Sequence, residues 1–93
     1  MAVYNISYDL HRPEQEYDKL YKAIKSLGDY RRPLLSLWFV ATTSTSKTIY
    51  ESLKPHLDTN DKIYIQKTMS DYWGALPRGE AGKEFWEWLS KNV

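Results

Sequence analysis

The chain has 93 residues, enough for a single domain with one small core. It contains no cysteine, which excludes a disulfide framework, a thiolate zinc site and a cysteine nucleophile. Its formal net charge of +1 argues against a protein that coats DNA through a general basic excess. No apolar run reaches the length of a signal peptide or a membrane span, so we expect a cytoplasmic protein with no membrane association.

Residues 3–10 alternate in character and predict the first and central strand. The even positions, from Tyr4 to Leu10, are large and apolar or amphipathic. The odd positions Asn5, Ser7 and Asp9 are small and polar. Because side chains on a strand alternate between faces, we expect one core face and one polar face that ends at the Asp9 carboxylate.

A helix is predicted next, because apolar residues recur at spacings of three and four between Tyr17 and Leu27. Pro13 suits its first turn, and Gly28 is predicted to end it. A short strand at about 30–34 and a longer one at 36–42 follow. Pro33 fits only an edge strand or a turn, which agrees with a break between them.

The Ser/Thr-rich stretch 42–46 favours a helix start, and a second helix is expected from about Ser46 to His56. Pro55 is predicted to loosen its last turn. Alternation over 62–68 indicates the last strand of the core. The tail, 69–93, is predicted as an ordered loop held by aromatic residues, followed by a short helix at about 81–91.

This order of elements predicts an α+β fold, a single ferredoxin-like βαββαβ sandwich with its core at 3–68. Both core helices would cover one face of the sheet. Leu37 and Phe39 would lie on the other face, together with the polar side of the first strand. An open face with large apolar groups predicts a homodimer whose two-fold axis brings both Asp9 side chains towards one cleft.

Several stretches together resemble a known family. They are Tyr8–Asp9 at the end of the first strand, the helix followed by Gly28, and the stretches 36–40 and 61–65. In this order they are similar to the small CRISPR-associated endonuclease family (Cas-two), which shares its fold with the virulence-associated protein D ribonucleases. The short bacterial and phage proteins called SinR-like are more similar still, with a Ser-Tyr-Asp-Leu start and a Trp-rich tail.

The resemblance implies roles for individual residues. In the endonuclease family the aspartate that ends the first strand is paired across a dimer and implicated in magnesium binding, which here is Asp9. Basic residues often precede the serine of the third strand, and Arg31 and Arg32 with Ser36 match that pattern loosely. The chain departs from the family at Pro33 and in its Trp-rich C-terminal helix, where CRISPR-associated members exchange a strand.

The residues themselves allow a functional and a structural interpretation. Asp9 suits a magnesium ligand, or it either caps the next turn or pairs with His11 or Arg12. His11 suits a general base, or it is an exposed loop residue. Arg31 and Arg32 suit phosphate binding, or they form a solvated loop. The tryptophans of the tail suit base stacking, or they belong to a core or an interface. They are Trp73, Trp86 and Trp88.

Three hypotheses about function follow. The first is a magnesium-dependent endonuclease that uses Asp9 and His11. The second is a non-catalytic binding module whose cleft, lined by Asn5 and Ser7 with arginines at its rim, holds nucleic acid or a nucleotide. Such a module would serve a phage or mobile element by sequestering a nucleotide signal or a host defence component. The third is a structural dimer that docks on another protein through its aromatic tail.

Overall fold

The computed structural model describes residues 1–12, 17–76 and 79–93. The expected role of Pro13 in opening the first helix falls outside these ranges. Within the described part of the chain, no helix combines the length and apolar character needed to cross a membrane. The elements are β1 (Ala2–Asp9), α1 (Asp18–Lys25), β2 (Asp29–Leu34), β3 (Leu37–Thr42), α2 (Ser46–Leu53) with the 3-10 turn η1 (Lys54–His56), β4 (Lys62–Lys67) and α3 (Glu80–Asn92).

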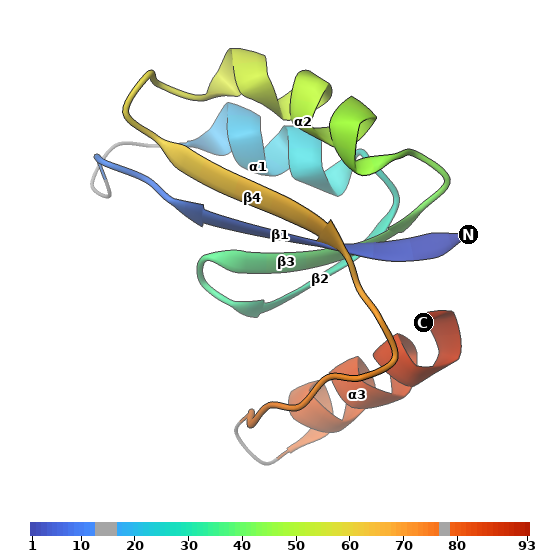
Figure 1. Cartoon of the computed structure of the whole chain (residues 1–93). Helices are drawn as coiled ribbons and strands as arrows, with labels where there is room; N and C mark the ends of the chain where they lie inside the picture. Colours follow the sequence, from blue (N-terminus) through green and yellow to red (C-terminus); the bar gives the residue numbers. More distant parts are fainter. Residues whose placement is uncertain (13–16, 77–78) are drawn as a thin grey trace.

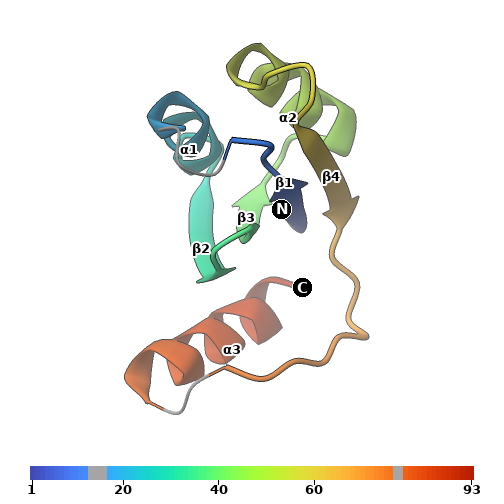
Figure 2. The ribbon, with the colours of Figure 1, turned by 90° about the vertical axis from the view of Figure 1, so that its left-hand side faces the viewer.

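The four strands form one antiparallel sheet in the order β2-β3-β1-β4, so β1 is a central strand, as predicted. Helices α1 and α2 lie side by side on one face of this sheet, and α3 lies on the other (Figures 1 and 2). The βαββαβ order and this sheet confirm the ferredoxin-like arrangement.

The main core lies between the sheet and the helices α1 and α2. Ile6 and Val40 are fully buried there, and Trp38 is almost so. The inward positions of the two helices complete this core, at Leu20, Ile24, Ile49 and Leu53. These positions recur at helical and strand spacing, which is why the sequence pattern predicted the elements.

A second, smaller core lies on the opposite face, under α3. Val3 and Ala41 from the sheet pack there against Phe85, Trp88 and Leu89. The rings of Phe39 and Phe85 meet edge to face with centroids 5.2 Å apart. The expectation that this face is open was therefore wrong for the part near Val3 and Phe39, because the chain covers it with its own C-terminal helix.

Local signals at the element ends were largely confirmed. Thr45 caps α2, since its side chain accepts a hydrogen bond from the Thr48 backbone N–H at 3.2 Å. Pro55 lies in η1, where the chain forms a 3-10 turn, so the last turn is tightened and not loosened as predicted. Pro33 lies on the edge strand β2, where the pairing register shifts between Arg31 and Leu34.

Gly28 has a role different from the predicted one. Helix α1 ends at Lys25 with Ser26 as its C-cap, so Gly28 does not end the helix. A Cβ atom at Gly28 would collide with the carbonyl oxygen of Ala41 on the neighbouring β3. Glycine is therefore required there by the close approach of two backbones at the start of β2.

Candidate functional site

The predicted polar strip lies on the face of β1 that points away from α1 and α2. Asn5 donates a hydrogen bond from Nδ2 to Thr68 Oγ1 at 2.9 Å. Ser7 is half-buried and lies opposite Leu37 and Tyr64 in the sheet register. Asp9 is exposed at the end of the strand, opposite Lys62. The strip is thus present, and its last carboxylate faces solvent.

Just past this strand, His11 lies against Asp61, which precedes β4. The backbone N–H of His11 donates to Asp61 Oδ1 at 3.0 Å, and His11 Nδ1 lies 3.0 Å from the same oxygen. Arg12 Nε donates to His11 Nε2 at 3.2 Å. Because a guanidinium cannot accept a hydrogen bond, Nε2 is the acceptor and Nδ1 carries the proton. Asp61 thus selects the tautomer of the imidazole that carries its proton on Nδ1.

The Asp61 side chain is fully buried and takes part in hydrogen bonds through both of its oxygens. Besides His11, the hydroxyl of Tyr17 donates to Oδ1 at 3.1 Å, and the backbone N–H of Asp58 donates to Oδ2 at 2.8 Å. Burial by itself raises the pKa of this carboxyl, but the hydrogen bonds from His11, Asp58 and Tyr17 outweigh it and lower the pKa to about 2. The same carboxylate and the burial of the phenol raise the pKa of Tyr17.

Asp58 adds a second carboxylate to this corner. Its Oδ2 is buried and has no hydrogen-bond partner among the residues that the structure describes. His11, Asp58 and Asp61 form a group whose potential ligand atoms all lie within 4.8 Å of one another, close enough to hold a metal ion. We call these three residues the β1 corner. Asp9, the metal ligand predicted from the sequence, is not a member of this group.

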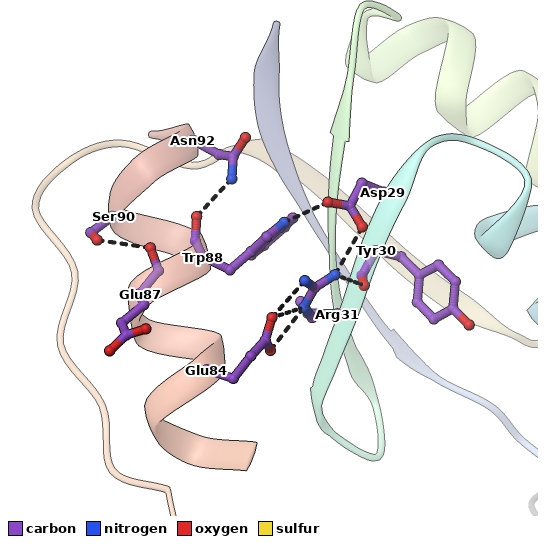
Figure 3. A network of polar contacts seen from close by, with 8 residues as sticks. All are labelled: Asp29, Tyr30, Arg31, Glu84, Glu87, Trp88, Ser90 and Asn92. Carbon is purple, nitrogen blue, oxygen red and sulfur yellow. Dashed lines mark hydrogen bonds and ion pairs between the residues drawn. The ribbon is translucent and has the colours of Figure 1, made fainter. Parts of the chain in front are cut away.

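Arg31 and Arg32 do not meet at one site, because neighbouring residues on a strand point to opposite faces. Arg31 faces α3 and binds Glu84 through Nε and Nη2, with its shortest contact at 2.6 Å. It also binds Asp29 at 2.8 Å and lies 4.8 Å from the ring centroid of Trp88 (Figure 3). These contacts hold the tail helix to the sheet.

Charges in this network stabilise one another. The hydrogen bonds from Trp88 and Arg31 lower the pKa of Asp29, and the bond from Arg31 lowers the pKa of Glu84. The bond to Glu84 in turn raises the pKa of Arg31. The Arg31 guanidinium is therefore already neutralised by two carboxylates of its own chain, which opposes the predicted role in phosphate binding.

Arg32 faces the opposite side, towards α1. Its guanidinium lies 4.7 Å from the ring centroids of Tyr21 and Trp38. Its Nη2 donates to the carbonyl oxygen of Leu35 at 2.7 Å and to the Tyr8 hydroxyl at 3.2 Å. The carbonyl oxygen of Ser36 accepts from the Tyr8 backbone N–H at 3.2 Å, in the exposed turn between β2 and β3. Arg32 and Ser36 thus shape the turn between β2 and β3 and its junction with β1.

Sequence analysis found His11 as a candidate site residue but did not single out Asp58 or Asp61. They do form a turn, since the Asp61 backbone N–H donates to the Asp58 carbonyl oxygen at 3.1 Å. The available signal was two carboxylates three residues apart just before a strand that pairs with β1. No protein-family model matches the chain.

The low pKa of Asp61 predicts a loss of stability in acid. Its folded-state pKa of about 2 lies below the ordinary value of 3.8, so the ionised form stabilises the fold above about pH 4. This contribution, about 2 kcal/mol, is lost as the pH falls from 4 towards 2. In urea unfolding, Asp61→Asn should lower the stability at pH 7 by a similar amount and flatten its decline below pH 4. Glu51→Gln, at an exposed position on α2, should leave both unchanged.

Proposed function

We propose that this chain is an endonuclease-like protein that binds nucleic acid and hydrolyses a phosphodiester bond at the β1 corner, with magnesium as its metal. The observation that carries the proposal is the pairing of His11 with the buried carboxylate of Asp61, beside Asp58 Oδ2, which has no hydrogen-bond partner in the described part of the chain. The resemblance to the SinR-like proteins and the CRISPR-associated endonucleases supports this assignment, because it also implies functional residues near the end of β1.

His11 is the proposed general base. Asp61 fixes the proton on Nδ1, so Nε2 carries the lone pair that can accept a proton from water as the water oxygen attacks phosphorus. The imidazolium can then give that proton to the oxygen of the broken P–O bond. The positive charge that forms on the imidazole is stabilised by the neighbouring carboxylate. Arg12, which donates to Nε2 in the free protein, would turn its guanidinium to the phosphate as the substrate enters.

The residues present also fit a divalent cation. Asp58 Oδ2 is a buried oxygen without a hydrogen-bond donor among the described residues, and carboxylate oxygens are the ligands that magnesium prefers. The β1 corner would hold the ion, with Asp58 as the carboxylate that still has an open oxygen. When bound, the ion would supply a positive charge that stabilises the phosphate in the transition state.

The test is cleavage of a single-stranded RNA and of a duplex DNA by the purified chain. We expect cleavage of at least one substrate with magnesium and its loss with a chelator. Asp58→Asn should abolish the response to magnesium, because it removes the charge of the unpartnered carboxylate. Asp71→Asn, a change of an exposed carboxylate in the tail, is the matched control and should behave as the parent chain. Cleavage that Asp58→Asn leaves unchanged would contradict the proposal.

A second candidate is the non-catalytic binding module. Asp61 Oδ1 already accepts three hydrogen bonds, which join the end of β1 to the turn before β4. This favours the binding module, because a carboxylate with that structural role needs no part in catalysis. In that case the chain should bind a nucleotide or a short nucleic acid without cleaving it. Binding that persists in chelator, with no product formed, would support this candidate over the endonuclease.

A further inference from the structure

Trp73 is the most exposed large apolar side chain in the described structure. It lies in the tail between β4 and α3, and its side chain is 100% accessible to solvent. A tryptophan that packs against a partner buries roughly 150–250 Å², so leaving it in water forgoes a large stabilising term. Leu34 and Leu35, at the turn between β2 and β3, are also exposed, by 50% and 85%. Exposed apolar groups of this size indicate an interaction surface.

Trp73 forms part of the rim of an apolar hollow of about 170 Å³. The walls come from β2, β3, the tail and α3, and none of the lining residues carries a charge. The residues that shape it include Leu34, Leu37, Phe39, Phe85 and Trp86. A cavity of about 150 Å³ with such walls accepts a benzene-sized ring. The hollow therefore suits one aromatic ring.

Packing within the chain forms this hollow before any partner arrives. The rings of Tyr72 and Trp86 are parallel, with an interplanar angle of 3° and centroids 6.2 Å apart. Phe85 meets Trp86 edge to face at 5.0 Å. Gly74 lies so close to Trp86 that an added Cβ atom would be 3.2 Å from its ring. A preformed site of this kind loses little conformational entropy when it is filled.

We propose that the occupant is a second copy of this chain, with Trp73 of each copy inserted into the hollow of the other. A protruding ring and an uncharged hollow that fits a ring lie beside each other on one surface. Such a surface is complementary to itself, which is the requirement for an isologous two-fold interface. None of the described residues that line the hollow is cationic, as a nucleotide phosphate would need, so these walls favour a protein ring over a nucleotide.

This interface differs from the dimer predicted from the sequence. That dimer used the open sheet around Leu37 and Phe39, whereas here both residues line a hollow that α3 and the tail complete. A standard interface buries about 800 Å² on each partner, and one tryptophan supplies about a quarter of that. Leu34 and Leu35 add to this area. The interface does not rest on the proposed nuclease function.

Sedimentation equilibrium of the full chain, from about 1 µM to about 1 mM, tests the proposal. We expect a reversible dimer in this range. Because Trp73→Ala removes a central aromatic residue from both copies, its dimer Kd should rise at least about 100-fold. Tyr64→Ala, which changes a 61% exposed aromatic residue on β4, is the matched control and should leave Kd unchanged. Since Trp73 is fully exposed, neither the circular dichroism spectrum nor the melting temperature of the monomer should change.

A direct readout comes from fluorine NMR of protein labelled with 5-fluorotryptophan, which gives one signal for each of four tryptophans. The signal missing from Trp73→Ala identifies Trp73. In the parent chain it should shift with concentration along the dimerisation curve. A chain that stays monomeric at about 1 mM would overturn the proposal. The occupant of the hollow would then be something other than a second copy of the chain. A dimer that is insensitive to Trp73→Ala, or in which the Trp73 signal does not move, would also overturn it.

Discussion

Replacing His11 by asparagine should lower the rate of phosphodiester cleavage by about 10²–10⁴-fold, the usual contribution of a positioned general base. The side chain is 29% exposed and its Nδ1 is held by Asp61, so the change removes the basic nitrogen without opening the main core. Single-turnover cleavage of the best substrate, measured across pH 5–9, is the appropriate assay.

The second histidine provides a matched control for this prediction. His56 is half-buried in η1, outside the β1 corner, and His56→Asn should retain the parent rate and pH profile. Asp61→Asn should lower the rate as well, because the amide no longer stabilises the imidazolium. Full activity in His11→Asn would contradict the assignment of the base and favour the non-catalytic module.

Replacing Trp88 by alanine should cost about 3–5 kcal/mol of the free energy that holds α3 to the sheet, as large aromatic deletions do. Trp88 is only 7% exposed, and its Nε1 donates to Asp29 Oδ2 at 2.7 Å. Its ring also lies under the Arg31 guanidinium (Figure 3). The two cores lie on opposite faces of the sheet, so α3 should detach while α1, α2 and the sheet stay folded.

Amide hydrogen exchange separates local from global unfolding for this variant. The amides of α3 should lose protection in Trp88→Ala, while those of α1 and α2 keep it. Glu84→Gln is the informative comparison, since it removes only the ion pair with Arg31. That pair is partly exposed, with side-chain accessibilities of 28% and 52%, and should contribute about 1 kcal/mol or less. Equal loss of protection in all three helices would mean that both cores unfold as one unit.

Among the predictions from sequence, those that depended on near neighbours in the chain were the most accurate. The alternation in β1 placed Ile6 in the core and Asn5 on the opposite face. The Ser/Thr-rich stretch predicted the start of α2 at Ser46, and Pro33 predicted an edge strand with irregular pairing. The alternation rule could also have separated Arg31 from Arg32, which were instead assigned to one cleft although adjacent strand residues face opposite ways.

The sequence by itself determined the order and type of the elements, because helix and strand periods are set by residues a few positions apart. The tertiary structure alone decided that Asp61 meets His11, since that contact joins residues 50 positions apart. It also decided that α3 covers the part of the second sheet face near Val3 and Phe39, and that the aromatic tail leaves Trp73 in solvent beside a hollow. An amphipathic helix must bury its apolar side, but its sequence does not say against which surface. That choice depends on the summed packing of residues far apart in the chain, which no local pattern records.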